Sequence, residues 1–492
     1  FFPGAGGVIL RSGRSGDALW ERNGTAIGER FGHAVTGCGD VNGDGIPDVA
    51  VSAPSYAVGG SFDRIRVLSG VDGSLLHDLI SDVDDNTGWS LAGNADTDGD
   101  GLIELIAGAP TADIASSSSG SSLWTNAGVV KCFEFGPGGV TLEVVATGSQ
   151  QGAPAGQSLA ALDLDGDGDD DVLYGEPHYT IGVLFDDSGR VRARDESGSL
   201  LFDQVGTLTE RLGYAVACAG EVDLDGLPDI AAGAPSFGAG SAYLFPTTEA
   251  TRQATGSSLG ALFGHDLVSL GDADGDGRDD LLVGEPYAFV FPTFPEGGRV
   301  SLRSGLDLSD LWSRYGETGD ENLGWTVANM GDVDLDGHDD FATGNPFVSG
   351  DENDVAFAQL WSSADAAATV GSVGDGLAGT LGVPQLKAFG APKLGGSTQI
   401  VFTNSAGVPT LAALHLGLTE AALPFKGGVL HTDPVINVVL SALPVPQINL
   451  DLAIPVDTWL TGFELWIQGS QVDVGAPVGV ALTRALVLTL GG

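Results

Sequence analysis

Short apolar runs bounded by Gly, Pro and Asp make up most of residues 1–370. Residues 48–54 (DVAVSAP), 64–69 and 75–80 are typical examples. Runs of this length, rich in aliphatic and β-branched residues and flanked by turn formers, predict β-strands and almost no long helix. The fold class expected from this pattern is all-β.

One unit of this pattern recurs six times. It begins with an apolar strand containing Phe-Gly or Leu-Gly, continues into an Asp-rich loop, and ends in a second strand that closes with Gly-Ala-Pro or a variant. A hairpin follows, so each unit has four short strands. A single four-stranded sheet leaves apolar faces uncovered, whereas blades around an axis cover one another. The pattern therefore predicts a β-propeller over residues 1–370.

The number of blades stays open between six and seven, and we favour seven. The sequence contains six loop-bearing strand pairs but seven outer hairpins, the extra one lying at residues 7–21. Seven blades need an inner strand pair from upstream sequence, from the C-terminal region or from another copy of the chain. Residues 1–13 align with residues 291–305, which predicts that the chain begins inside a repeat.

The character of the chain changes after residue 370. Only seven of its 66 acidic residues lie in residues 371–492. Runs such as 398–403, 435–440 and 481–490 alternate apolar and polar residues between Gly and Pro. This pattern predicts a β-sandwich-like C-terminal domain over residues 371–492.

The charge excludes two classes of partner and favours a third. A formal net charge of −46 repels nucleic acid phosphates and anionic lipid surfaces. We therefore expect no nucleic acid partner, and the chain has no apolar run long enough to predict a membrane span. Because 42% of the residues are hydrophobic, a disordered acidic polymer is a poor fit, and we expect the acids to form cation sites.

The six Asp-rich loops carry those predicted sites. In the first loop, oxygen-bearing side chains stand at positions 1, 3, 5 and 9, Gly at position 6 permits a sharp turn, and the carbonyl at position 7 adds a ligand. The predicted ligands at positions 1, 3, 5, 7 and 9 are Asp40, Asn42, Asp44, Ile46 and Asp48 in loop 1; Asp96, Asp98, Asp100, Leu102 and Glu104 in loop 2; Asp163, Asp165, Asp167, Asp169 and Asp171 in loop 3; Glu221, Asp223, Asp225, Leu227 and Asp229 in loop 4; Asp272, Asp274, Asp276, Arg278 and Asp280 in loop 5; and Asp332, Asp334, Asp336, His338 and Asp340 in loop 6.

The ion predicted for these loops is Ca²⁺. Several carboxylates in one short loop repel one another unless a divalent cation lies among them. Calcium accepts six to eight oxygen ligands in flexible geometry, whereas Mg²⁺ requires strict octahedral geometry and retains its waters. We expect about six calcium ions, one for each loop.

The unit resembles the FG-GAP repeat of integrin α-subunit propellers and of their bacterial relatives. The resemblance rests on Phe31-Gly32, on the loop from Asp40 to Asp48, and on Ala53-Pro54. It implies a calcium-stabilised propeller with binding surfaces on the loops of one face. Two repeats depart from it with Gly-Trp and two with Gly-Glu-Pro. The C-terminal part is similar to a domain common on secreted planctomycete proteins.

No motif for a catalytic nucleophile with its base, or for a zinc protease, occurs in the chain, so we expect no enzyme. Two hypotheses of similar weight are an extracellular or cell-surface adhesion module that binds a protein or glycan ligand, and a structural protein that assembles with copies of itself. A secreted polysaccharide-active enzyme or glycan-binding protein is the alternative.

Overall fold

All regular secondary structure in the described part of the chain is β-strand. The computed structural model describes residues 4–13, 17–54, 63–81, 85–115, 123–136, 138–182, 186–236, 238–288, 297–316, 322–333, 339–345, 357–361, 370–373, 386–389, 397–403, 410–417, 420–425, 428–432, 436–443, 447–453, 464–472, 480–482 and 485–489. The chain divides into two compact units, Phe1–Asp334 with Phe341–Leu360, and Trp361–Gly492 with Leu335–Asp340. None of the described residues forms a helix long and apolar enough to cross a membrane.

The first unit is a series of antiparallel sheets, one for each sequence repeat. Blade 1 contains β3 (Val35–Gly37), β4 (Val49–Ala53), β5 (Arg64–Leu68) and β6 (Leu75–Ile80); blade 2 contains β7 (Leu91–Ala95), β8 (Glu104–Ala109), β11 (Val129–Gly136) and β12 (Gly139–Thr147); blade 3 contains β13 (Leu159–Leu162), β14 (Asp171–Gly175), β15 (Arg190–Arg194) and β16 (Leu200–Val205). Blade 4 contains β17 (Ala215–Gly220), β18 (Asp229–Ala234), β19 (Ser241–Phe245) and β20 (Arg252–Thr255); blade 5 contains β21 (Leu267–Ser269), β22 (Leu281–Glu285), β23 (Arg299–Arg303) and β24 (Asp310–Tyr315); blade 6 contains β25 (Thr326–Gly331), β26 (Asp340–Asn345) and β27 (Phe357–Trp361). A short hairpin of β9 (Ile114–Ala115) and β10 (Leu123–Trp124) lies between the second and third strands of blade 2.

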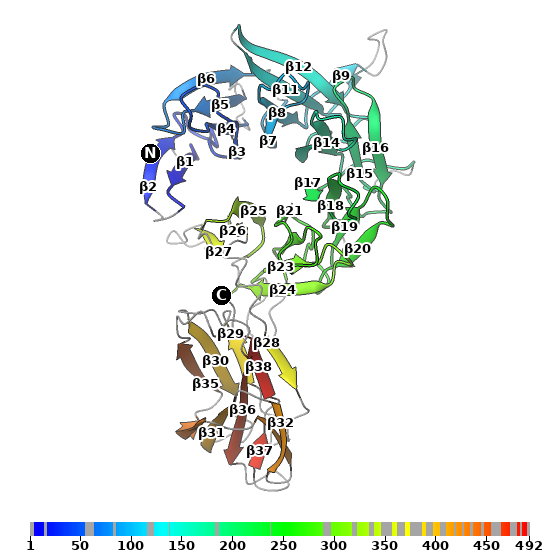
Figure 1. Cartoon of the computed structure of the whole chain (residues 1–492). Helices are drawn as coiled ribbons and strands as arrows, with labels where there is room; N and C mark the ends of the chain where they lie inside the picture. Colours follow the sequence, from blue (N-terminus) through cyan, green and yellow to red (C-terminus); the bar gives the residue numbers. More distant parts are fainter. Residues whose placement is uncertain are drawn as a thin grey trace. The chain divides into compact units, whose positions relative to one another are not determined.

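These sheets are arranged as the blades of a β-propeller. The first strand of each blade contacts the first strand of the next, from β3 through β7, β13, β17 and β21 to β25. Figure 1 shows the blades following one another around a curve with these strands innermost. The repeat therefore folds as the sequence predicts, as a propeller.

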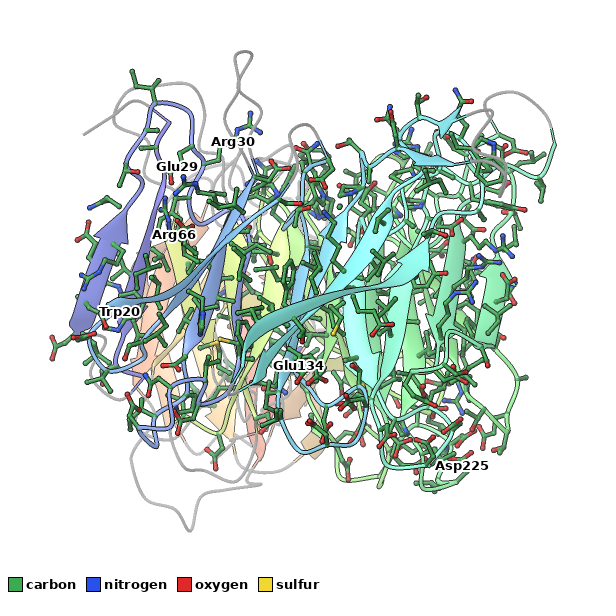
Figure 2. All side chains as sticks on the ribbon, turned by 90° about the horizontal axis from the view of Figure 1, so that it is seen from above. Trp20, Glu29, Arg30, Arg66, Glu134 and Asp225 are labelled. Atoms are coloured by element: carbon green, nitrogen blue, oxygen red, sulfur yellow. The ribbon has the colours of Figure 1, made fainter. Side chains whose placement is uncertain are left out.

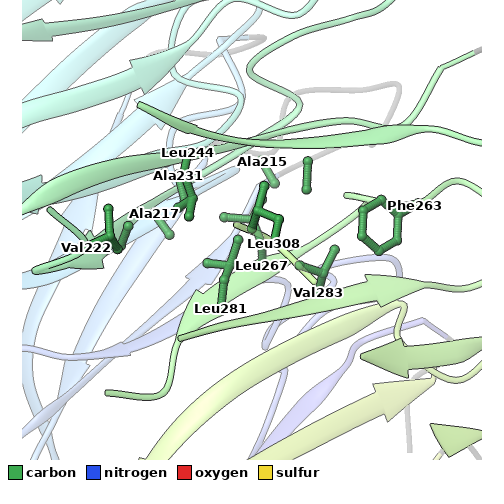
Figure 3. Packing of buried hydrophobic residues seen from close by; sticks show 12 residues of the cluster. Ala215, Ala217, Val222, Ala231, Leu244, Phe263, Leu267, Leu281, Val283 and Leu308 are labelled. Carbon is green, nitrogen blue, oxygen red and sulfur yellow. The ribbon is translucent and has the colours of Figure 1, made fainter. Parts of the chain in front are cut away.

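The core lies between neighbouring blades. One cluster joins Ala231 and Leu244 of blade 4 to Phe263, Leu281 and Val283 of blade 5, all with at most 1% of their surface exposed. Figure 3 shows these side chains interleaved between the two sheets. Burial of the two faces against each other explains why one four-stranded sheet is stable only next to another.

The N-terminal hairpin of β1 (Gly7–Arg11) and β2 (Ala18–Asn23) lies beside blade 1. Its Trp20 is buried in the same cluster as Phe31 and donates a hydrogen bond to the Gly70 carbonyl at 3.0 Å. Gly6 forms a parallel β-bridge to Phe31. In blades 2 to 5, the residue just before the third strand forms the same kind of bridge to the turn that leads into the next blade. The hairpin thus has the relation to blade 1 that the outer half of a preceding blade would have.

An acidic side chain closes the turn that precedes several blades. Glu29, two residues before Phe31, accepts a hydrogen bond from the Ala26 amide at 2.9 Å and pairs with Arg66 of β5 at 2.6 Å. Glu210 is placed likewise before blade 4 and accepts the Thr207 amide at 2.7 Å. Each carboxylate therefore ties a turn between blades.

The two Gly-Glu-Pro variants supply this carboxylate from a different position. Blades 3 and 5 have Ala153 and Ala261 where Glu29 and Glu210 stand in their own repeats. In blade 5, Glu285 is fully buried, accepts the Ser257 hydroxyl at 2.8 Å and lies 3.4 Å from Arg299. In the Gly-Glu-Pro repeats, the Glu after the second strand therefore replaces the carboxylate that the turn itself lacks.

The second unit contains only strands among its described residues. One sheet joins β28 (Val370–Val373), β38 (Ala485–Thr489), β36 (Glu464–Val472), β31 (Thr410–Gly417) and β34 (Ile436–Leu443), with β37 (Val480–Leu482) paired to β36. A second sheet joins β29 (Leu386–Phe389), β30 (Ser397–Thr403) and β35 (Gln447–Ala453), and β32 (Glu420–Phe425) pairs with β33 (Gly428–Thr432).

Candidate metal centres

The Asp-rich loops connect the first and second strands of the blades. Figure 2 shows Asp225 of loop 4 at the opposite edge of the propeller from Arg30, which lies in the turn before blade 1. An acidic loop follows the first strand of its blade, whereas the turn between blades leads into the other end of that strand. The two sets of connections therefore lie on different faces of the propeller.

Loop 1 shows how the side-chain oxygens hold the loop backbone. Asp40 accepts the Gly45 amide at 2.6 Å, and Asn42 accepts the Asp44 amide at 2.9 Å. The buried Asp48 accepts the Val41 amide at 2.9 Å, which ties the end of the loop to its start. These are Asx-type turns that need no metal to form.

The same hydrogen bonds recur in loops 2, 3, 4 and 5. In each loop the acid at position 1 accepts the amide of position 6, and the acid at position 9 accepts the amide of position 2. Position 6 is always a Gly with positive φ, between 82° and 103° in loops 1 to 5. The Gly at this position is therefore a conformational requirement.

Four loops bring three carboxylates within 4.8 Å of one another. The clusters are Asp96, Asp98 and Glu104 in loop 2; Asp163, Asp165 and Asp171 in loop 3; Glu221, Asp223 and Asp225 in loop 4; and Asp272, Asp274 and Asp276 in loop 5. Of the other predicted carboxylates in these loops, Asp100, Asp229 and Asp280 lie outside the clusters. Asp167 belongs to a separate cluster with Asp169 and Glu196.

The first and last loops are not among these clusters. Loop 1 has an amide, Asn42, at position 3, so it offers fewer carboxylates. In loop 6 only Asp332 and Asp340 belong to the described residues; the predictions for Asp334, Asp336 and His338 lie outside them.

Burial next to other acids makes the charged state of the position 9 carboxylates of loops 3, 4 and 5 costly. Burial, together with the neighbouring Asp165, raises the pKa of Asp171 to about 7. Burial also raises the pKa of Asp280 to about 7, with Asp274 contributing, and that of Asp229 to about 6. A divalent cation in the loop would offset this cost directly.

Two loops contain buried carboxylate oxygens that accept no hydrogen bond. Glu104 is 2% exposed; its Oε2 accepts the Thr97 amide at 2.6 Å, but its Oε1 has no partner, nor has Oδ1 of Asp96 in the same cluster. In loop 4, Asp223 is 7% exposed and its Oδ1 also lacks a partner. Buried polar atoms normally find a partner. An all-oxygen donor set with such orphaned atoms fits Ca²⁺ better than a transition metal.

Other residues of the site were missed by the sequence analysis. Thr248, just after β19, donates its amide and its hydroxyl to Asp223, each at 2.7 Å. Glu196, in the turn between β15 and β16, joins Asp167 and Asp169 in a further acidic cluster. Neither residue lies in a loop of the repeat pattern, so only the fold brings them to it.

Comparison with known proteins agrees with the geometry of the repeats. The FG-GAP repeat family matches residues 31–68, 155–192, 213–245 and 263–302. These segments contain loops 1, 3, 4 and 5. The chain contains FG-GAP repeats.

Part of the chain is also similar to integrin α subunits. Integrin alpha pat-2 of Caenorhabditis elegans is 29% identical over 234 residues, which cover 41% of this chain and 18% of that protein. Integrin alpha-4 of Xenopus laevis is 35% identical over 150 residues (27% and 14%), and integrin alpha-8 of Mus musculus is 34% identical over 151 residues (29% and 14%). The aligned part of the chain therefore spans less than a fifth of the length of these relatives, and the chain is FG-GAP and integrin-α-like.

A solved structure described as a tetra-tandem repeat in the extending region of a large adhesion protein aligns over 96% of this chain and 85% of its own. The sequence identity is 12% and the TM-score is 0.15, which is too low to indicate a shared fold.

Proposed function

We propose that this protein is an extracellular calcium-binding propeller that acts in adhesion, with about six structural calcium ions in its FG-GAP loops. The observation that carries the proposal is the buried Glu104, whose Oε1 lacks a hydrogen-bond partner beside two further carboxylates of loop 2. Similarity to integrin α subunits supports an adhesion-type role at the cell surface.

Calcium in these loops would be structural. Each loop fixes the turn between the two inner strands of its blade, and the acid at position 9 begins the second strand in four of the blades, as Glu104 does in blade 2. Ions that bind only the folded loops raise the free energy of unfolding by mass action, by about 2.7 kcal/mol per site at a hundredfold excess over Kd.

Thermal unfolding in calcium and in excess chelator tests the metal assignment. We expect a large fall in Tm on chelation, and a smaller fall for Glu104→Gln in calcium because it removes one ligand charge. The matched control is Glu143→Gln, at an exposed position of β12 in the same blade. Equal melting curves with and without calcium would contradict the assignment.

Adhesion is tested by the dependence of binding on calcium. Immobilised protein is exposed to a panel of extracellular matrix proteins and to a glycan array, in calcium and in chelator. We expect binding to a protein ligand that is lost in chelator. Binding restricted to glycans would favour the glycan-binding alternative.

Self-assembly is the second candidate, and one feature of the fold favours it. Within the described residues β1 pairs only with β2, whereas the third strands of blades 1 to 5 pair on both edges. A free edge is able to pair with a strand of another chain. Size analysis of the full chain across a range of concentrations tests this: growth of large particles supports assembly, and a constant monomer mass argues against it.

A further inference from the structure

Neighbouring cation loops are joined by a repeated pair of hydrogen bonds, but only at some blade boundaries. The joined positions are position 1 of one loop and position 8 of the next. Position 8 stands between the predicted ligands at positions 7 and 9, so a hydrogen bond that fixes position 8 also orients these two ligands.

Loops 2 and 3 are joined in this way. The Asp96 amide donates to Oδ2 of Asp170 at 3.0 Å, and the Asp170 amide donates back to the Asp96 carbonyl at 2.7 Å. Asp96 is a predicted ligand of loop 2, and Asp170 lies between the ligands Asp169 and Asp171 of loop 3. One reciprocal contact therefore fixes ligands of both sites.

Loops 4 and 5 repeat the arrangement. The Glu221 amide donates to Oδ2 of Asp279 at 2.9 Å, and the Asp279 amide donates to the Glu221 carbonyl at 2.9 Å. Arg278, at position 7 of loop 5, adds a hydrogen bond from its guanidinium to the Val222 carbonyl of loop 4. Hydrogen bonds from positions 7 and 8 of loop 5 therefore hold the boundary between blades 4 and 5.

The boundary between loops 1 and 2 and the boundary between loops 3 and 4 lack the acid that makes the link. Between loops 1 and 2, position 8 is Ile103, and between loops 3 and 4 it is Pro228. Neither side chain accepts a hydrogen bond, and Pro228 has no amide hydrogen to donate.

We propose that Asp170 and Asp279 are positioning residues that couple neighbouring cation sites, so that loops 2 and 3, and loops 4 and 5, bind their ions as cooperative pairs. This inference rests on the proposed calcium function. It is supported at loops 2 and 4 by the buried, unpartnered oxygens of Glu104 and Asp223. An ion that orders one loop also orders the linked residue of its neighbour, so part of the ordering cost of the second site is already met.

The test is a calcium titration of the full chain followed by hydrogen exchange and mass spectrometry, which gives a separate midpoint for each loop. Asp165→Ala disables loop 3, since Asp165 belongs to its carboxylate cluster. We expect this variant to raise the midpoint of loop 2 by about fivefold or more. The midpoint of loop 4, which has no link to loop 3, should change less than twofold.

Removing the link should remove the coupling. With Asp170→Ala in the background, Asp165→Ala should move the loop 2 midpoint less than twofold. Asp170→Asn keeps an acceptor for the Asp96 amide and should retain the coupling, which separates loss of the link from a general disturbance of loop 3.

Three results would overturn the coupling: an unchanged loop 2 midpoint in Asp165→Ala, equal shifts in loops 2 and 4, or a shift that persists with Asp170→Ala. If no loop of the unmodified chain gains protection in calcium, the calcium assignment itself fails, and with it the coupling.

Discussion

The carboxylate that closes the turn between blades should be transferable from one position to another. Glu285 is fully buried, accepts the Ser257 hydroxyl and lies 3.4 Å from Arg299. Removing one partner of a buried pair typically costs about 3–5 kcal/mol. Because Arg299 also pairs with Asp310, we expect Glu285→Ala to cost about 3 kcal/mol, the low end of this range.

The rescue is the informative part of the experiment. Ala261 stands where Glu29 and Glu210 close the equivalent turns of other blades, so Ala261→Glu should restore at least half of the lost stability in the Glu285→Ala background. Ala261→Glu alone should destabilise, because it places two acids in one buried turn.

The free energy of unfolding of the four proteins is measured by urea unfolding in calcium, and Tm should shift by about 1–1.5 °C per kcal/mol in a unit of this size. If Ala261→Glu deepens the defect of Glu285→Ala, the two positions do not serve one turn, and the account of the Gly-Glu-Pro repeats is wrong.

Three further predictions follow from local geometry. Leu262 has a φ of 60°, and the same turn position before blades 2 and 6 is Asn, so Leu262→Asn should raise the free energy of unfolding by about 0.5–1 kcal/mol in urea melts. The hydrogen bond from Arg190 lowers the pKa of Asp203, so the pair stabilises the fold above a pH of about 4, and this stabilisation is lost as the pH falls through the folded-state pKa. Asp203→Asn should therefore cost about 1–2 kcal/mol at pH 7 and less at pH 3. Because the pKa values of Asp171 and Asp280 are raised to about 7, the stability that comes from their protonated forms is lost as the pH rises from about 4 to 7. Tm in chelator should therefore fall between pH 5 and pH 8, and calcium should abolish that fall.

The sequence was sufficient to predict the strands, the propeller and the position of the acidic loops, because each is a local pattern repeated six times. It was also sufficient to place Gly at position 6, where the backbone has positive φ. These features depend on residues close together in the chain, and repetition makes them visible.

Contacts between residues far apart in the chain were not predicted. Thr248 reaches Asp223 only because β19 returns beside loop 4, and Asp170 meets Asp96 only because two blades are neighbours. One such relation did have a signal in the sequence: the blades with Gly-Glu-Pro have Ala153 or Ala261 two residues before the Phe-Gly position of the same repeat, where the other blades have an acid. Gly-Glu-Pro alone is only a departure from the repeat; the relation becomes visible when it is compared with the Ala at the turn.

The most direct test of the central claim is a count of bound ions. The full chain is dialysed against equal millimolar calcium and magnesium and then against metal-free buffer, and the retained metal is measured by mass spectrometry. The account predicts about six calcium ions per chain and little magnesium. A chain that retains neither metal, or that retains magnesium in preference, would contradict it.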